Sequence, residues 1–125
     1  MKEKERKFIL KYLPEGLESV KIIQGYMMLD GNKHLRVRVV SGSRGVQCYL
    51  TFKNVLSKTV KEEYEYLIPY HDAVEMLDNT NRKLEKVRYH DNFKGNHVDI
   101  DIYPNGIQVV EIEYEDELDE LPDYC

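Results

Sequence analysis

Several residue types are scarce in this chain, and each scarcity excludes a class of protein. The 125 residues contain no tryptophan, four prolines, seven glycines and two cysteines, Cys48 and Cys125. Two cysteines so far apart cannot form the disulfide framework of a small secreted domain, so we expect a reduced, cytoplasmic protein. No apolar run approaches the roughly 18 residues of a membrane span. The charged start from Met1 to Lys4 is unlike a signal peptide, and we expect no membrane association.

Neither sign of charge is in large excess. Eighteen lysines and arginines stand against 23 acidic residues, which gives a formal net charge of −5. A protein that binds duplex nucleic acid needs a basic excess, so we expect no nucleic-acid partner. The chain has no repeat and no linker rich in proline, glycine or serine. With 42% hydrophobic residues, residues 1–125 are expected to form a single domain with one core.

A period of two dominates the pattern that is present. Eight segments alternate in side-chain character and are rich in valine, isoleucine, tyrosine and phenylalanine, which is typical of strands. The expected strands are residues 3–10, 21–29, 34–40, 46–53, 61–68, 84–90, 97–103 and 107–115. The links between them are mostly short and carry turn signals such as Asp30-Gly31-Asn32, which favours antiparallel hairpins. Residues 70–79 predict a short helix after Pro69, and residues 14–20 predict a second one.

Charged residues within these segments fall into sets of like sign. Because strand side chains alternate, residues i and i+2 lie on one face, about 7 Å apart. These sets are Glu3 and Glu5 with Lys7 beyond them, Arg36 with Arg38, Glu63 with Glu65, Lys86 with Arg88, Asp99 with Asp101, and Glu111 with Glu113. One such pair is typical of a solvated strand face. However, two like charges at this spacing repel by roughly 2 kcal/mol at an effective dielectric constant of 20, and four acidic pairs repeat that cost.

The repeated pairs indicate ligands of opposite charge. Carboxylate pairs suit hard divalent cations such as Mg²⁺ or Mn²⁺, and basic pairs suit phosphate oxygens. If the strands close into a barrel, the charged face becomes a lumen wide enough for one slender ligand. The predicted fold class is therefore mainly β (β-rich α+β). We expect an eight-stranded antiparallel closed barrel, or tunnel, with one or two short helices covering its apolar outer face.

The same residues resemble the sequence blocks of the CYTH, or triphosphate tunnel metalloenzyme, family. Residues 3–7 match its amino-terminal Glu-x-Glu-x-Lys signature, and further blocks follow in order to about residue 124. These blocks are Gln24-Gly25-Tyr26-Met27, Arg36-Val37-Arg38, Leu50-Thr51-Phe52-Lys53, residues 63–69, Asp72-Ala73, residues 84–89, Asp99-Ile100-Asp101 and Glu111-Ile112-Glu113. The chain is most similar to short members of the inorganic triphosphatase kind.

The resemblance implies a tunnel in which metal ions and basic side chains hold a triphosphate. The implied ligands of Mg²⁺ or Mn²⁺ are Glu3, Glu5, Glu63, Glu65, Asp101, Glu111 and Glu113. The implied phosphate-binding residues are Arg36, Arg38, Lys53, Lys86 and Arg88. Lys7 and Tyr26 resemble a catalytic pair that activates the attacking water.

The implied activity is metal-dependent hydrolysis of a linear triphosphate, preferably inorganic triphosphate, to diphosphate and phosphate. Adenylate cyclase, thiamine triphosphatase and nucleoside triphosphatase remain alternatives within the family. A non-catalytic protein that binds a nucleotide or polyphosphate is an alternative from another functional class. The expected partner is a small-molecule triphosphate. A homodimer is left open, because relatives often pair and an apolar outer face would gain from cover.

Three positions depart from the family pattern. Leu67 stands where relatives commonly carry an acid, and Asn54 follows Lys53 in place of a glycine. The chain stops at Pro122-Asp123-Tyr124-Cys125, where relatives continue into a helix. We therefore expect a tunnel that is looser, or open at both ends.

Two further features carry weaker expectations. The four histidines, His34, His71, His90 and His97, have spacings that match no compact zinc motif, so we expect no zinc site. The acidic residues from 115 to 123 are expected to form a solvated terminus.

Overall fold

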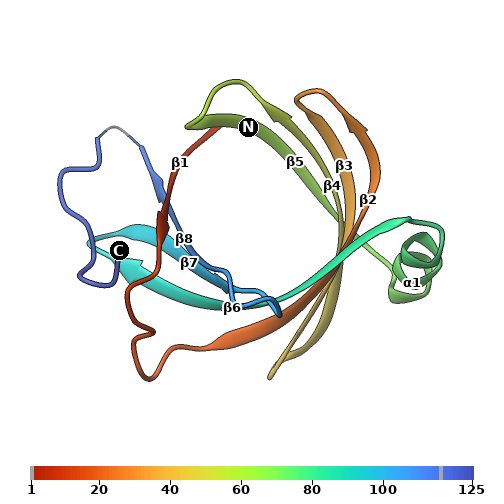
Figure 1. Cartoon of the computed structure of the whole chain (residues 1–125). Coiled ribbons are helices and arrows are strands. Elements are labelled where there is room, and N and C mark those ends of the chain that lie inside the picture. Colours follow the sequence, from red (N-terminus) through yellow and green to blue (C-terminus); the bar gives the residue numbers. More distant parts are fainter. Residues whose placement is uncertain (1, 116) are drawn as a thin grey trace.

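Eight strands close into an antiparallel barrel, as the alternating segments predict (Figure 1). The structure, a computed structural model, describes residues 2–115 and 117–125. Within these residues the strands are β1 Lys2–Ile9, β2 Ser19–Asp30, β3 Lys33–Gly42, β4 Gly45–Val55, β5 Val60–Ile68, β6 Arg82–Phe93, β7 Asn96–Ile102 and β8 Gln108–Tyr114. Their order around the barrel is β1-β5-β4-β3-β2-β6-β7-β8. The first strand closes the barrel by pairing with both β5 and β8, so the predicted fold class is confirmed.

A two-residue turn fixes the register of the β6–β7 hairpin. Lys94 and Gly95 both have positive φ, at 51° and 84°. Two successive residues of positive φ are the requirement of the tight turn whose twist matches that of the flanking strands. Glycine adopts this conformation without steric cost, whereas Lys94 adopts it against the preference of an L-residue. The turn places Phe93 opposite Asn96 and sets every pair that follows in the hairpin.

The helix α1, Tyr70–Asp78, covers the outer face of β2, β3 and β4 (Figure 1). Pro69 caps it in an extended conformation, and the helix buries Ala73 and Leu77 against the apolar cluster of Val37, Val39 and Cys48. Gly25 on β2 allows this close approach, because a Cβ atom there would lie 2.5 Å from Thr80 Oγ1. The helix predicted over residues 70–79 is confirmed, one residue shorter.

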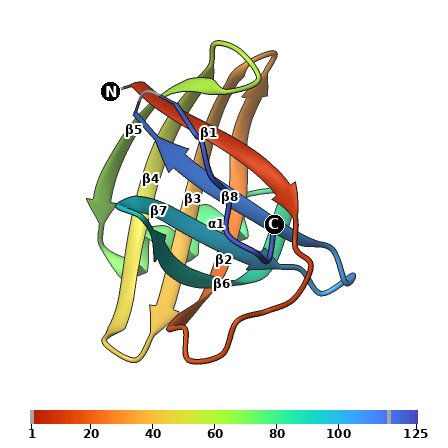
Figure 2. The same ribbon diagram turned by 90° about the vertical axis from the view of Figure 1, so that its left-hand side faces the viewer.

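The second predicted helix, over residues 14–20, is wrong. The described chain forms a turn at Glu15 and Gly16, and β2 begins at Ser19. Gly16 has a φ of 79°, which interrupts the right-handed helical conformation after a single turn. The segment instead connects the end of β1 to β2 across the base of the barrel (Figure 2).

The carboxy-terminal segment covers the outer face of β7 and β8 (Figures 1 and 2). Tyr124 is buried in a cluster with apolar residues of both strands, and its hydroxyl donates a hydrogen bond of 2.6 Å to Asp91 Oδ2. The acidic side chains of Glu117, Asp119 and Glu120 are exposed, in agreement with the expectation of a solvated terminus. Asp116 lies outside the described residues. An extended segment, rather than a helix, therefore covers this side of the barrel.

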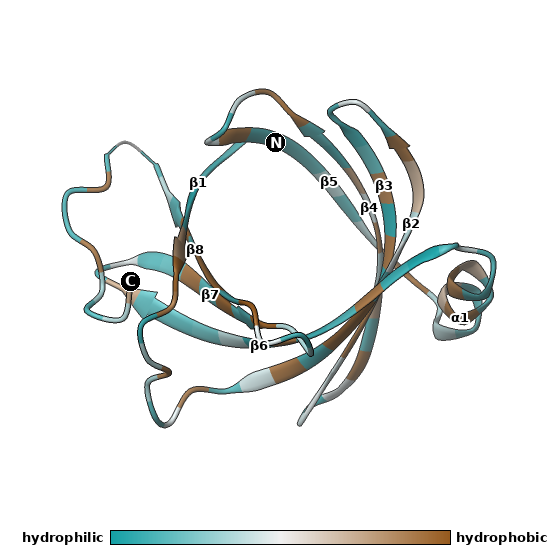
Figure 3. Ribbon diagram, viewed as in Figure 1, coloured by the Kyte–Doolittle hydropathy of each residue, from teal (hydrophilic) through white to brown (hydrophobic). Residues whose placement is uncertain are grey.

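The apolar cores lie outside the barrel wall, and the polar residues lie inside it. The buried apolar residues of β7 and β8 are Val98, Ile100, Val110 and Ile112, and they face the carboxy-terminal segment. Their neighbours Asp99 and Asp101 are buried as well, on the opposite face of β7. Figure 3 shows the resulting alternation of hydrophilic and hydrophobic residues along the strands. No helix among the described residues is long and apolar enough to cross a membrane.

Candidate functional site: a charged barrel interior

Strand register brings the like-signed sets together inside the barrel. Glu5 on β1 pairs with Glu113 on β8, and Glu3 pairs with Lys61 on β5. The buried charged residues of the interior include Glu5, Arg36, Arg38, Lys61, Lys86, Asp99 and Asp101. Charges from five or more strands thus share one interior, as the alternation of strand faces predicts.

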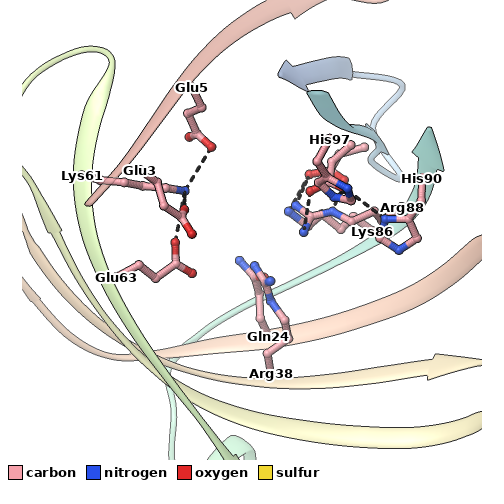
Figure 4. A network of polar contacts seen from close by, with 12 residues as sticks. Glu3, Glu5, Gln24, Arg38, Lys61, Glu63, Lys86, Arg88, His90 and His97 are labelled. Carbon is pink, nitrogen blue, oxygen red and sulfur yellow. Dashed lines mark hydrogen bonds and ion pairs between the residues drawn. The ribbon is translucent and has the colours of Figure 1, made fainter. Parts of the chain in front are cut away.

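Three carboxylates surround one ammonium group on the wall formed by β1 and β5 (Figure 4). Lys61 Nζ lies 3.1 Å from Glu5 Oε2, 3.2 Å from Glu63 Oε2 and 3.7 Å from Glu3 Oε2. Burial opposes the charge of Lys61, but the carboxylates of Glu63 and Glu5 outweigh it and raise the pKa of this lysine. Burial also opposes the charge of Glu63, but Lys61 and Arg36 lower the pKa of its carboxyl.

Lys61 was missed as a site residue in the sequence analysis, although the signal was present. Lys61, Glu63 and Glu65 stand at i, i+2 and i+4 on one strand, so all three face the same way. Pairs of like sign do not include a base that stands beside acids on its own strand. Lys61 partly neutralises the carboxylates that the resemblance implies as metal ligands.

The wall formed by β2, β3 and β4 carries bases with few acidic partners. Arg38 is buried, and its Nε donates a hydrogen bond of 3.0 Å to Gln24 Oε1, which is neutral. Burial, with the charges of Arg36 and Arg88, lowers the pKa of Arg38 to about 10. Arg36 Nη2 reaches Glu63 Oε1 at 3.2 Å, but its buried Nε has no hydrogen-bond partner among the described residues.

The positive charge of Lys53 on β4 is also poorly compensated by acidic neighbours. Burial and the nearby charges of Lys61 and Arg36 lower its pKa to about 8, with Lys7 contributing in the same direction. A lowered lysine pKa means that the charged form is poorly solvated and poorly paired in the protein alone. An anionic ligand would remove that deficit.

On the opposite wall, Asp101 holds two bases. It is fully buried and accepts hydrogen bonds from Lys86 Nζ at 2.7 Å and from Arg88 Nε and Nη2 at 2.7 and 2.9 Å. Burial opposes its charge, but the hydrogen bond and charge of Arg88, together with Lys86, lower the pKa of Asp101. Burial and the charge of Arg88 lower the pKa of Lys86 to about 8 despite this pairing. Both oxygens of Asp101 are therefore engaged by bases, which favours a positioning role.

The two residues implied as a catalytic pair stand on strands that are not neighbours in the barrel, β1 and β2. The Tyr26 hydroxyl accepts a hydrogen bond of 2.8 Å from Gln24 Nε2. Lys7 lies opposite Glu111 in the strand register and lines a cavity with Glu5 and Lys53. No hydrogen bond joins Lys7 to Tyr26 in the part of the chain that the structure describes. Gln24, which links Tyr26 to Arg38, was absent from the sequence-predicted site.

The remaining acids implied as metal ligands lie at different depths. Glu65 is exposed and accepts a hydrogen bond of 3.0 Å from Thr51 Oγ1. Glu111 lies opposite both Lys7 and Asp99 in the register. Burial raises the pKa of Glu113, with Asp99 and Glu5 adding to the shift against the opposing charge of His97. Leu67 is exposed near the end of β5.

The carboxylate set fits a hard divalent cation. Burial raises the pKa of Glu3, and the neighbouring charges of Glu63 and Glu113 raise it further. Glu5 and Glu113 face each other directly across β1 and β8, an arrangement that is repulsive without a cation between them. Oxygen ligands of this kind are those that Mg²⁺ and Mn²⁺ prefer.

Two of the four histidines, whose spacing in the sequence matches no zinc motif, lie close together on the β6–β7 hairpin. His90 Nδ1 and His97 Nε2 both approach Asp99 Oδ1, at 2.9 and 2.8 Å. One nitrogen from each ring and one oxygen of Asp99 lie within 4.8 Å of one another, close enough for one metal ion. Sequence spacing did not predict this cluster, because its members come from two strands that the hairpin brings side by side.

Comparison with known proteins agrees with this geometry. The profile of the CYTH domain family matches residues 1–124. An inorganic triphosphatase from Acetivibrio thermocellus is 37% identical over an alignment of 126 positions, which covers 93% of this chain and 76% of that protein. The crystal structure of the inorganic triphosphatase NE1496 is similar over 98% of this chain and 82% of its own, with 27% identity and a TM-score of 0.65.

A conserved hypothetical protein from Pyrococcus furiosus shares the fold. Its TM-score is 0.72 at 22% identity, and the similarity covers 92% of this chain and 80% of that one. Since the family profile spans almost the whole sequence, and the A. thermocellus relative is similar over most of both chains, this chain belongs to the CYTH domain family.

Proposed function

We propose that this protein hydrolyses a linear triphosphate, preferably inorganic triphosphate, to diphosphate and phosphate with the help of Mg²⁺ or Mn²⁺. The observation that carries the proposal is a group of three bases, the buried Arg36 and Arg38 and the half-buried Lys53, whose charges are incompletely paired and which lie beside a carboxylate cluster. A polyanion with bound cations satisfies both groups at once. The 37% identical relative is an inorganic triphosphatase, which supports this substrate.

The bases bind and orient the phosphate chain. Arg36 offers a buried Nε that has no hydrogen-bond partner among the described residues, and Arg38 is held by Gln24. Lys86 and Arg88 approach from the opposite wall and are positioned by Asp101. Arginine and lysine groups fixed in this way stabilise the negative charge that shifts onto the leaving diphosphate.

The acids Glu3, Glu5, Glu63 and Glu113 hold the divalent cations, with Glu65 and Glu111 as support. Mg²⁺ or Mn²⁺ bound there would neutralise phosphate charge and orient the attacking water. Lys61 shares the same carboxylates at 3.1–3.7 Å, so it sets the net charge of the cluster. Its presence limits how many cations the cluster holds tightly.

Lys7 positions the attacking water and, in its neutral amine form, takes the proton of that water, becoming the ammonium ion. It lines the cavity that also contains Glu5 and Lys53, so it lies beside both the carboxylates and the bases. Tyr26 acts from the β2 wall, where its hydroxyl is fixed by Gln24. General base catalysis of this kind contributes about 10²–10⁴-fold to a rate.

The direct test is phosphate release from inorganic triphosphate, ATP and thiamine triphosphate with Mg²⁺, with Mn²⁺ and with EDTA. We expect turnover of inorganic triphosphate that requires a metal and falls by about 10²–10³-fold in Glu5→Gln and in Lys53→Met. Arg6→Met is the matched control, since Arg6 lies on the outer face of β1 over the ring of Phe8. Unchanged turnover in Glu5→Gln and Lys53→Met would contradict the proposal.

The same assay distinguishes the alternatives. Cyclic AMP formed from ATP would identify a cyclase, and preferential turnover of ATP or thiamine triphosphate would identify those activities. Tight triphosphate binding without turnover under any metal would identify a non-catalytic binder. A cytoplasmic location, a single domain over residues 1–125 and a homodimer stay predictions from the sequence.

A further inference from the structure

We propose that His90, His97 and Asp99 form a second metal site, which binds a borderline transition-metal ion such as Zn²⁺, Co²⁺ or Ni²⁺ and not Mg²⁺. The site is distinct from the carboxylate cluster around Lys61 in its position and in its ligand atoms (Figure 4). Imidazole nitrogens suit this class of ion, whereas Mg²⁺ prefers oxygen ligands. The inference goes beyond the proposed triphosphatase activity and does not depend on it.

The hairpin geometry explains why the three residues converge. His90 on β6 pairs directly with Asp99 on β7, and His97 stands two residues before Asp99 on the same face. The two rings lie with centroids 5.6 Å apart and planes tilted by 38°. The Lys94-Gly95 turn closes the hairpin a few residues away, so the strands hold these positions at fixed separation.

Both rings direct a nitrogen at the same carboxylate oxygen. His90 Nδ1 and His97 Nε2 lie 2.9 and 2.8 Å from Asp99 Oδ1. A tetrahedral ion with bonds of about 2.0–2.2 Å needs its ligand atoms roughly 3.4 Å apart. Because the three ligand atoms already lie within 4.8 Å of one another, small side-chain rotations make room for the ion.

Asp99 is oriented by a partner of its own. Its Oδ2 lies 3.3 Å from Arg88 Nη1, which leaves Oδ1 directed at the histidines. Arg88 gives its two shorter hydrogen bonds to Asp101, so its charge is shared with a second carboxylate. Outer partners that fix a ligating carboxylate are typical of metal sites and contribute to their affinity.

The surroundings favour a cation and leave it accessible. His97 lines a cavity of ≈ 470 Å³ together with Glu3 and Glu113, at one mouth of the barrel. The side chains of His90 and His97 are 41% and 47% exposed, whereas that of Asp99 is 10% exposed. Three protein ligands with an open side toward the cavity leave a position for water or a further ligand atom.

The test is titration of the metal-free full chain, without an affinity tag, with Co²⁺ followed by visible absorption, and with Zn²⁺ followed by calorimetry. With excess Mg²⁺ present to occupy the carboxylate cluster, we expect one Co²⁺ ion per chain with the absorption of a nitrogen-containing, four- or five-coordinate site. His90→Ala and His97→Ala should each weaken binding by at least about tenfold, since each removes a ligand. A large excess of Mg²⁺ should leave the absorption unchanged.

Two controls separate this site from the rest of the protein. His71→Ala removes an exposed histidine of α1, outside the barrel, and should leave Co²⁺ binding unchanged. Glu63→Gln alters the carboxylate cluster and should also retain the Co²⁺ spectrum. Because both proposed ligands are partly exposed, we expect the alanine variants to keep the circular dichroism and melting temperature of the parent. His90→Gln and His97→Gln, which retain a polar side chain, repeat the test if an alanine variant unfolds.

The proposal is overturned if Co²⁺ binds with equal affinity in the parent and in the His90 and His97 variants. Displacement of Co²⁺ by Mg²⁺ in proportion to concentration would also overturn it, since that behaviour belongs to an oxygen-only site. Loss of the Co²⁺ spectrum in Glu63→Gln with retention in both histidine variants would place the ion at the carboxylate cluster instead.

Discussion

Single side chains inside the barrel are held in charge states that a polyanion would change. Lys53 is the clearest case, because burial and neighbouring bases lower its pKa to about 8. An ordinary lysine has a pKa near 10.4 and carries its charge throughout the neutral range. The barrel therefore holds a base that is only partly protonated just above pH 8, and Lys86 adds a second with the same pKa.

We predict that triphosphate binding at pH 8–9 is accompanied by proton uptake. A bound polyanion favours the charged form of Lys53, so it raises the pKa and the complex binds more protons than the free protein. Affinity should accordingly fall as the pH rises above 8. Calorimetry in buffers of different ionisation enthalpy measures the uptake directly.

The control for this prediction is a lysine on the outer surface. Lys53→Met should reduce the proton uptake, whereas Lys21→Met should not, since Lys21 lies on the outside in an exposed pair with Glu85. Equal uptake in Lys53→Met and the parent would show that the protons are bound elsewhere.

Asp101 is a buried acid that pairs with two bases, Lys86 and Arg88. We predict that Asp101→Asn lowers the free energy of unfolding by about 3–5 kcal/mol, because Lys86 and Arg88 lose a fully buried carboxylate. Glu85→Gln, which breaks an exposed ion pair between β6 and β2, should lower the free energy of unfolding by at most about 1 kcal/mol. Urea unfolding of both variants measures the difference, and similar losses in both would contradict this role for Asp101.

Residue-level prediction from the sequence succeeded where alternation alone decides the outcome. The alternation of side chains along each strand predicts that Glu5, Arg38 and Asp101 point into the barrel. The structure places all three side chains inside it. Contacts between strands did not follow from it, because they depend on register and stagger. The approach of Lys61 to three acids, and the hydrogen bond from Arg38 to Gln24, belong to that second kind.

At the scale of elements, the strands were predictable and the covering segments less so. Each strand carries its own periodic signal over seven or more residues. Residues 14–20 are too short to carry such a signal, and Gly16 in a left-handed conformation decided against a helix there. The covering role of residues 117–125 depends on tertiary packing of Tyr124, which no local pattern indicates.

The docking of α1 on β2 gives a test at this scale. We predict that Gly25→Ala lowers the free energy of unfolding by about 1–3 kcal/mol, because the added Cβ would meet Thr80 Oγ1 at 2.5 Å and Leu77 Cδ2 at 3.0 Å. Thermal and urea unfolding measure the change. The double variant Gly25→Ala/Thr80→Ala lacks the obstructing hydroxyl. Its loss in free energy of unfolding should be smaller than the sum of the losses in the two single variants. Additive losses would show that α1 does not approach Gly25 this closely.

At the scale of the whole molecule, the barrel is inverted relative to an ordinary small barrel. Its apolar residues face outward and are covered by α1 on one side and by the carboxy-terminal segment on the other. Its charged residues face a common interior, where one group joins Lys61 to acids and another joins Lys86 and Arg88 to Asp101. This arrangement costs free energy through burial of charge. A ligand with both cations and anionic oxygens would offset that cost, which links the fold to the proposed substrate.

In the proposed mechanism the inward-facing charges, and not their outward neighbours, act on a metal-bound triphosphate. Glu63 and Glu62 are adjacent on β5 and face opposite sides of the barrel wall, so the same substitution at each separates the two surfaces. The decisive measurement is kcat/KM for inorganic triphosphate with Mn²⁺ in Glu63→Gln and Glu62→Gln. We predict a fall of about 100-fold in Glu63→Gln and a change within about twofold in Glu62→Gln. Equal changes in kcat/KM in the two variants, whether both rise or both fall, would show that the inward-facing carboxylate has no special role.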